Sequence, residues 1–369
     1  MRMRAAIFDG PGHDLVLTDI DIQDPKHDEV RVRITAAGIC HSDYRVLAGE
    51  WGATTPLVLG HEGAGIVESV GAGVHSLRPG DTVALSWTPS CNRCRYCVTG
   101  RPQLCRSAVA NAYRNVLPDG TTRLSRDGED VYSYLSVGSF AEYVVVPESG
   151  AIRIDPGIDP AVAAIVGCAV TTGVGAAINT RPVRVGESVL VIGAGGVGLS
   201  VIMGAALQSP GRLIAVDIAD SKLQLAKSFG ATDTIDATAG DVVEAVRELT
   251  GGEGVDLAFE ASGRAAGVEQ AYASLAAGGT AVVVGQVATG ERISIDPMAM
   301  SGRELTLTGS NYGSARPAVD FGRILDLYRR GLLPLDRLVT GRIRLPELTD
   351  AFRTMGRSAT EGRWVVEFP

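Results

Sequence analysis

The first 156 residues alternate between short apolar runs and turn-forming residues. The runs are rich in β-branched side chains, and Gly, Pro and Asp separate them, which is typical of short strands. We predict strands at 4–10, 28–38, 63–71, 81–87 and 141–147. This part of the chain is therefore expected to be mainly β.

From about residue 183 the pattern changes to strand followed by helix, repeated several times. Strands are predicted at 188–192, 213–217, 233–236, 255–261, 280–285 and 305–309. Amphipathic segments at 220–229 and 241–250 lie between them, and each ends at a glycine. Such alternation predicts a doubly wound parallel sheet. Helices at 318–330 and 347–355 and a last strand at 363–368 are expected near the C-terminus.

Two uncharged stretches, 161–178 and 188–211, are long enough to raise the question of a membrane span. The second contains six glycines and changes halfway from a β-branched run to a helix-like run. This is the pattern of a buried strand followed by a buried helix in a soluble fold. We therefore predict no membrane-spanning helix.

Composition narrows the function classes. The 369 residues are 45% apolar and 21% charged, which is near the globular average, and two domains are expected from the length. The net charge is −8 and Lys and Arg form no dense run, so nucleic-acid and anionic-membrane partners are not expected. A small-molecule substrate fits better. The six cysteines are too few for a secreted disulfide scaffold, and the N-terminus is not a signal peptide, so we expect a cytoplasmic protein.

A glycine motif directly follows the strand at 188–192. The residues Gly193, Gly195 and Gly198 form G-x-G-x-x-G, with Gly196 and Val197 at the start of the next helix. The first glycine permits a tight turn, the second lets a pyrophosphate approach the backbone, and the third lets helix and strand pack closely. This context predicts a dinucleotide site.

Asp217 ends the next strand, nineteen residues after Gly198. Its carboxylate would accept hydrogen bonds from the adenosine ribose hydroxyls and repel a 2′-phosphate, which favours NAD over NADP. Lys222 is a further candidate for the ribose, although an exposed helix lysine is usually only solvated. Alternatively, the glycines serve packing alone and Asp217 caps the following helix.

Four cysteines lie close together at Cys91, Cys94, Cys97 and Cys105. Four thiolates on one irregular loop suit a tetrahedral zinc ion, and closed four-cysteine sites are structural. The alternatives are an iron–sulfur cluster or four unrelated reduced thiols.

The other two cysteines, Cys40 and Cys168, are distant from each other and from His61 and Glu62. Their separation in the sequence does not indicate that they form a common metal site. Taken singly, Cys168 fits a buried packing thiol and His61 a loop histidine as well as metal ligands. The residues alone leave both interpretations open.

Taken together, Gly38-Ile-Cys40-His41-Ser42-Asp43, Gly60-His61-Glu62, the four-cysteine loop, Gly167-Cys168 and the glycine motif resemble the zinc-dependent medium-chain alcohol dehydrogenases. The resemblance runs essentially end to end. It implies a GroES-like catalytic domain at 1–169 and 313–369 that encloses a Rossmann NAD-binding domain at 170–312. The implied fold class is α/β plus β.

The resemblance also implies a catalytic zinc ion in addition to the structural one, which makes two per chain. Cys40, His61 and Cys168 would bind it and leave an open position, with Glu62 as an alternative ligand. Asp43 would orient His61 through its other ring nitrogen, and Ser42 would take the alcohol proton.

For the cofactor, the resemblance implies that Thr172 and Val197 pack against the nicotinamide. His41 would pass the proton to solvent or pair with the pyrophosphate, and Arg363 would bind a phosphate. Two positions depart from family patterns. Arg45 stands where many members have a relay histidine, and Val109 stands where members that oxidise the glutathione adduct of formaldehyde have an arginine.

Trp51, Trp87 and Leu135 match positions that line the substrate cleft, although either tryptophan fits a core role equally well. We expect an NAD-linked dehydrogenase for primary aliphatic or aryl alcohols, acting as a homodimer or homotetramer. The alternatives are an enzyme that recycles tightly bound NAD(H) with a second acceptor, and a hydroxymethyl-thiol dehydrogenase. A non-catalytic NAD-binding protein is disfavoured because it needs no open metal position.

Overall fold

The computed structural model describes residues 1–357 and 360–369, and the chain divides into two compact units. The first unit comprises Met1–Cys168, Arg316–Gly331 and Leu335–Pro369. The second comprises Ala169–Ala315 and Leu332–Pro334. The two ends of the chain therefore build one unit, and the middle builds the other.

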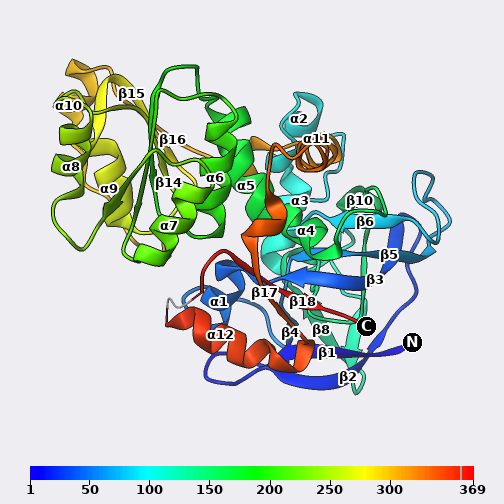
Figure 1. Ribbon diagram of the computed structural model, residues 1–369. Coiled ribbons are helices and arrows are strands. Elements are labelled where there is room, and N and C mark those ends of the chain that lie inside the picture. The colour runs from blue at the N-terminus through cyan, green and yellow to red at the C-terminus, as the bar shows by residue number, and fades with distance from the viewer. Residues whose placement is uncertain (358–359) are drawn as a thin grey trace. The chain divides into compact units, whose positions relative to one another are not determined.

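The first unit contains two β systems (Figure 1). A closed barrel has the order β1 (Arg2–Phe8), β2 (Val16–Ile22), β7 (Leu124–Arg126), β8 (Glu129–Ser133) and β4 (Leu57–Val58). A seven-stranded sheet has the order β10 (Ala151–Arg153), β6 (Thr82–Leu85), β5 (Glu62–Val70), β3 (Glu29–Gly38), β18 (Arg363–Glu367) and β17 (Val339–Ile343), with β9 (Tyr143–Pro147) also paired to β3. Both contribute to one apolar core.

Within the described residues, the α-helices of the same unit are α1 (His41–Leu47), α2 (Arg95–Val98), α3 (Arg106–Arg114), α4 (Pro160–Ile165), α11 (Pro317–Arg329) and α12 (Leu348–Gly356). Six strands of this unit are absent from the sequence prediction, namely β2, β4, β7, β8, β10 and β17. Strands β7 and β8 are only three and five residues long and partly exposed, so they carry little periodic signal.

The second unit is a six-stranded parallel sheet in the order β13 (Asp233–Asp236), β12 (Arg212–Asp217), β11 (Ser188–Ile192), β14 (Val255–Glu260), β15 (Leu275–Val283) and β16 (Thr306–Gly309). Its helices are α5 (Thr171–Gly175), α6 (Gly196–Ala206), α7 (Asp220–Ser228), α8 (Val242–Leu249), α9 (Ala265–Ala273) and α10 (Pro297–Gly302). Helices α6 and α7 lie on one side of the sheet and α8 and α9 on the other (Figure 1). The predicted fold class, a GroES-like domain with a Rossmann sheet inserted in its sequence, is confirmed.

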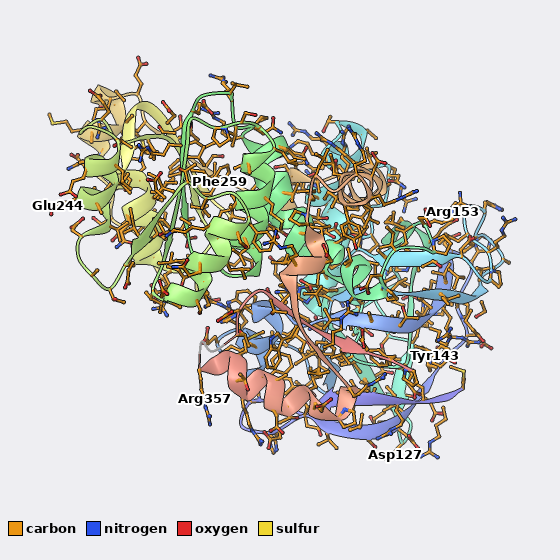
Figure 2. The ribbon with its side chains drawn as sticks, in the orientation of Figure 1. Asp127, Tyr143, Arg153, Glu244, Phe259 and Arg357 are labelled. Carbon is orange, nitrogen blue, oxygen red and sulfur yellow. The ribbon has the colours of Figure 1, made fainter. Side chains whose placement is uncertain are left out.

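Burial explains why these strands read as continuous apolar runs. Helices cover both faces of the sheet, so β11 buries Val189 to Ile192 without alternation. Phe259 of β14 is fully buried, whereas Glu244 of α8 points away from the sheet (Figure 2). Asp241 caps α8 by accepting hydrogen bonds from Val243 N and Glu244 N.

One helical segment of the described chain, Pro160–Thr180, is long and apolar enough to cross a membrane. However, 89% of its most apolar stretch is buried inside the protein, which is typical of a core helix.

Candidate active site and metal centres

Strand register gathers three distant parts of the chain at one end of the seven-stranded sheet. Strand β3 pairs antiparallel with β5 and β18, and Gly38 lies opposite both Glu62 and Val365. Cys40 follows β3, and His61 directly precedes β5. Helix α4 packs against β3 and β5 and continues into a π-helical turn, Val166–Val170, that carries Cys168. Such turns occur frequently at functional sites.

These elements bring four candidate ligands together. One atom from each of Cys40, His61, Glu62 and Cys168 lies within 4.8 Å of the others. Cys40, His61 and Glu62 are buried, and Cys168 is 9% exposed. The two thiols and the imidazole are separated by 20 or more positions in sequence, so only the fold joins them.

Asp43 holds this cluster in place from α1. Its Oδ1 accepts hydrogen bonds from Gly60 N at 2.9 Å and from His61 Nδ1 at 3.2 Å, and its Oδ2 accepts from Cys40 N at 3.2 Å. The His61 bond leaves Nε2 for a metal ion. Burial alone would lower the pKa of His61, but the Asp43 carboxylate and the Cys40 thiolate together raise it well above its usual range.

Gly60 sets the position of His61 in the backbone. Its φ is +90°, and a Cβ atom there would lie 2.6 Å from Ser139 Oγ and 2.9 Å from Phe140 N. Ser139 N and Phe140 N donate hydrogen bonds to the carbonyls of Gly60 and Leu59. Only glycine fits this turn without displacing the neighbouring segment.

The thiols form a strongly polarised pair. A hydrogen bond with Cys168, together with the charge of Arg363, lowers the pKa of Cys40 well below its usual range. The same bond raises the pKa of Cys168, and burial adds to this effect. A buried thiolate beside a thiol and an imidazole is the donor set that zinc prefers, because the ion compensates the negative charge. The residues therefore fit a zinc ion with three protein ligands.

Glu62 forms an ion pair with Arg363 at the back of the cluster. The Arg363 guanidinium donates to Glu62 Oε2, and both side chains are almost completely buried. Burial raises the pKa of Glu62 to about 7, although the Arg363 charge opposes this. Arg363 Nε is buried without a hydrogen-bond partner. The ion pair was not foreseen, because 301 residues separate its partners, and phosphate binding by Arg363 stays a prediction.

Tyr134 is a further neighbour of the cluster that the sequence did not indicate. Its ring meets the His61 ring edge-on, with centroids 5.5 Å apart, and its hydroxyl donates to Ser42 O at 3.4 Å. Tyr134 is 5% exposed. No motif marks it, because a single tyrosine near a turn has many other uses.

The predicted proton-transfer residues lie on α1. Ser42 Oγ is 3.6 Å from Cys40 Sγ, and the side chain is half-buried. His41 is exposed and packs against Tyr44. Arg45 stacks over the Trp51 ring at 5.4 Å from its centroid and contacts Glu50 at 3.4 Å.

The predicted pocket residues have one property in common. Trp51, Trp87 and Leu135 are each half-buried and pack against the edge of the core of the first unit. Each therefore presents part of its apolar surface away from the core. Such partial exposure suits a pocket lining, and it is also usual for tryptophans at the edge of a core.

The four-cysteine loop is compact. The sulfur atoms of Cys91, Cys94, Cys97 and Cys105 lie within 4.8 Å of one another, and Cys91 N donates to Cys105 Sγ at 3.3 Å. Backbone N–H groups lower the pKa of Cys94 to about 6, whereas burial and neighbouring thiols raise the pKa of Cys97 to about 12. Four thiolates in this space repel each other unless a cation joins them, so the loop fits a closed zinc site.

The glycine turn of the second unit fits a dinucleotide. A Cβ at Gly193 would lie 2.7 Å from Ser262 N, and one at Gly198 would lie 1.7 Å from Gly193 O, so both glycines serve close packing. At Gly195 a Cβ would meet nothing within 4 Å, and φ is an ordinary −78°. Internal packing thus does not require glycine there, whereas a phosphate approaching the N-terminus of α6 does.

Asp217 ends β12 next to this turn. Its carboxylate accepts hydrogen bonds from Ala194 N at 2.7 Å, Ile218 N at 2.8 Å and Ala219 N at 3.2 Å. A carboxylate has about four acceptor positions, so capacity for a ribose hydroxyl remains. Lys222 is half-buried on α7.

Thr172 and Val197 are both half-buried in the second unit. They lie on α5 and α6, which pack so closely that a Cβ at Gly173 would lie 2.4 Å from Val197 O.

Comparisons with known proteins agree with this architecture. Residues 26–156 match the family described as alcohol dehydrogenase GroES-like domain, and residues 196–329 match the family described as zinc-binding dehydrogenase. An S-(hydroxymethyl)glutathione dehydrogenase of Escherichia coli O1:K1 / APEC is 37% identical over 363 residues, covering 96% of this chain and 97% of the relative.

Solved structures extend the likeness along the full length. Benzyl alcohol dehydrogenase from Acinetobacter calcoaceticus has a TM-score of 0.94 at 31% identity, with both chains covered completely. A zinc-binding dehydrogenase from Sinorhizobium meliloti 1021, bound to NADP, has a TM-score of 0.81 at 30% identity, again over 100% of each chain. The chain therefore belongs to the zinc-dependent medium-chain alcohol dehydrogenases, a family of NAD(P)-linked oxidoreductases.

Proposed function

We propose that the protein oxidises primary aliphatic or aryl alcohols to aldehydes with NAD, and catalyses the reverse reaction. The observation that carries this proposal is the buried cluster of Cys40, His61 and Cys168, with His61 held by Asp43. A purely structural zinc site would have four committed protein ligands, as the cysteine loop does. Here Glu62 is paired with Arg363, which supports an open fourth position.

In this proposal Cys40, His61 and Cys168 hold the catalytic zinc. When bound, zinc acts as a Lewis acid that makes the alcohol hydroxyl more acidic and polarises the aldehyde carbonyl, and NAD accepts the hydride. Asp43 fixes the tautomer and orientation of His61. Glu62 stays behind the cluster as an alternative ligand, balanced by Arg363.

Ser42 Oγ is the proposed first acceptor of the alcohol proton, because it lies 3.6 Å from the thiol of a proposed ligand. His41 is the next residue in the chain, and its exposed position suits it to pass the proton to solvent. Arg45 is held by Trp51 and Glu50 and, as a guanidinium, keeps its own proton, so the route is proposed to pass through His41.

We propose NAD as the preferred cofactor. Asp217 places a carboxylate beside the glycine turn, where it would accept ribose hydroxyls and repel a 2′-phosphate. Lys222 is proposed as a second ribose contact, and Thr172 and Val197 as the nicotinamide contacts of this unit. These roles rest on the packing of α5 against α6.

The substrate class rests on Trp51, Trp87 and Leu135, which we propose as the apolar lining of the alcohol site. Aromatic side chains provide a large contact area for aliphatic or aryl groups. The structural likeness to a benzyl alcohol dehydrogenase supports the same class.

The test is NAD reduction across short, long and benzylic alcohols, with zinc counted per chain. We expect turnover with apolar alcohols, a preference for NAD over NADP, and a count near two. Turnover of charged or sugar alcohols alone would exclude the apolar site. Retention of activity after complete zinc removal would exclude the metal-dependent mechanism.

A hydroxymethyl-thiol dehydrogenase is the second candidate, favoured by the name of the Escherichia coli relative. Val109, which is half-buried on α3, provides no charge for the carboxylate of a glutathione adduct. We therefore expect low kcat/KM for formaldehyde plus glutathione compared with benzyl alcohol. The opposite ranking would make the thiol adduct the substrate.

A third candidate keeps NAD(H) bound and regenerates it with a second acceptor. This candidate is supported if turnover requires an artificial electron acceptor and if added NAD does not increase the turnover rate. Turnover proportional to free NAD at low concentration would exclude it.

We further propose a soluble cytoplasmic protein that forms a homodimer or homotetramer. Strand β16 is the last strand of its sheet, and Thr306, Thr308 and Gly309 on it are exposed. Unpaired edge strands pair readily with another chain. Met298 on α10 is also 80% exposed. Light scattering of the purified protein tests this, and a monomer at micromolar concentration would contradict it.

A further inference from the structure

A strained turn lies against the candidate active site in the first unit. Leu135 and Ser136 have φ values of +50° and +61°, although neither is glycine. Two consecutive residues with positive φ are unfavourable for ordinary side chains, and such strain persists only where the surroundings enforce it. Tyr134 and Ser136 are buried, and Leu135 between them is half-buried.

The chain on both sides of this turn is tied to the segment that carries His61. Ser133 on β8 pairs with Val58 on β4, and Ser139 N donates to Gly60 O at 2.9 Å. The turn therefore has to bulge beside His61. This bulge places the Tyr134 ring against the imidazole and the Tyr134 hydroxyl on Ser42 O.

Asn115 enforces the turn from the end of α3. It is 2% exposed and itself adopts a left-handed conformation, with φ +58° and ψ +36°. Its side-chain Oδ1 accepts a hydrogen bond from Leu135 N at 3.1 Å, and its carbonyl accepts from Ser133 N at 3.2 Å. Ser136 Oγ donates to the next carbonyl, that of Val116, at 2.7 Å. Asn115 and Val116 thus hold the turn at three points.

We propose that Asn115 is a positioning residue for the alcohol site: its side-chain oxygen holds the Leu135–Ser136 turn and so seats Tyr134 against His61 and Ser42. This inference rests on the proposed function, in which His61 and Ser42 act on the alcohol. Asn115 accepts its hydrogen bonds from Leu135 N and Ser133 N and not from either of these two residues. Its effect passes through the turn, which also carries Leu135 of the proposed alcohol lining.

The test is Asn115→Gly, which keeps the left-handed backbone accessible and removes the side-chain acceptor with the rest of the carboxamide. We expect kcat/KM for benzyl alcohol to fall about tenfold, the lower end of the range for residues that orient metal ligands. The KM for NAD and the zinc count should stay unchanged. Asn115→Asp keeps an acceptor oxygen and tolerates the same backbone, so it should recover most of the loss.

Asn111→Ala is the matched control. It removes an amide from the same helix that donates to Ser107 Oγ at 3.3 Å instead of holding the turn, and it should leave the kinetics unchanged. A merely structural role would lower the fraction of active protein in Asn115→Gly without changing kcat/KM per zinc-loaded site. That result, or an Asp variant no better than the Gly variant, would overturn the proposal.

A double-mutant cycle shows whether the effect passes through Tyr134. If it does, Asn115→Gly should reduce kcat/KM by less than about threefold in a Tyr134→Leu background. Independent, multiplicative losses would contradict the proposed path. Absence of alcohol turnover in the wild type would instead refute the proposed function, so the two failures are distinguishable.

Discussion

Replacing Asp43 by Asn tests the geometry of the candidate catalytic site most directly. In the wild type the carboxylate accepts three N–H donors, from Gly60, His61 and Cys40. An amide oxygen in the place of Oδ1 can still accept from Gly60 and His61. The amide NH2 would then face the Cys40 N–H, so one hydrogen bond is lost and two lose their charge assistance.

The magnitude follows from these bonds. A hydrogen bond to a charged group contributes roughly 1.5–3 kcal/mol, about twice the value of a neutral one. Weakening the His61 bond alone therefore costs about 1–1.5 kcal/mol, which corresponds to roughly tenfold weaker zinc binding at this site. We expect kcat/KM for the alcohol to fall by about the same factor or more.

The pH dependence has a defined sign. Zinc binding requires neutral His61, whose pKa is raised in the metal-free protein by Asp43, so protons compete with zinc in the wild type as the pH falls. Asp43→Asn lowers that pKa and weakens this competition. The difference in zinc affinity between variant and wild type should therefore be largest at high pH and shrink towards acidic pH.

The assay is competition for zinc with a chromophoric chelator at several pH values, together with alcohol oxidation kinetics. Asp241→Asn is the matched control, because it changes a carboxylate that caps α8 and Asn caps helices equally well. Zinc affinity within twofold of the wild type at pH 8, with unchanged kcat/KM, would refute the role of Asp43.

Three further predictions concern the cysteine loop, the glycine turn and Glu260, a buried residue at the end of β14. Cys97→Ser should reduce the zinc count from two to one and lower the melting temperature by about 5 °C or more, because a structural zinc contributes folding free energy. Calorimetry that shows an unchanged melting temperature and two zinc ions per chain in the variant would contradict this prediction. Asp217→Ala should raise the ratio of kcat/KM for NADP to that for NAD about tenfold. An unchanged ratio would show that the Asp217 carboxylate does not discriminate between a ribose hydroxyl and a 2′-phosphate. Burial raises the pKa of Glu260 in the folded protein, whereas this carboxyl group titrates at about pH 4.3 in the unfolded chain. Between these two pKa values the folded protein binds a proton that the unfolded chain has released. As the pH rises between these pKa values, the free energy of unfolding of the wild type should fall relative to that of Glu260→Gln, which does not ionise. Denaturant titrations of both proteins at pH 4.5 and 8 measure this difference in free energy. A difference that is the same at both pH values would contradict the raised pKa of Glu260.

The parallel sheet and the two local motifs followed from the sequence, because their determinants are close together in the chain. The cysteine loop lies within fifteen residues, and the glycine turn adjoins its strand and helix. Apolar runs separated by amphipathic helices indicated the parallel sheet. Short barrel strands such as β7 and β8 escaped prediction, since three to five partly exposed residues carry too little periodicity.

The candidate catalytic cluster is different, because the residues alone left Cys40, His61 and Cys168 unconnected and only a family resemblance grouped them. Their meeting depends on strand register: pairing of β3 with β5 and β18 brings residues near Gly38, Glu62 and Val365 to one sheet end. The sequence by itself thus determined the longer, periodic elements and the local metal and dinucleotide motifs. Tertiary structure decided the Glu62–Arg363 ion pair, the Tyr134–His61 contact and the hold of Asn115 on its turn, because hydrogen-bonded register and core packing act between residues that are far apart in the chain.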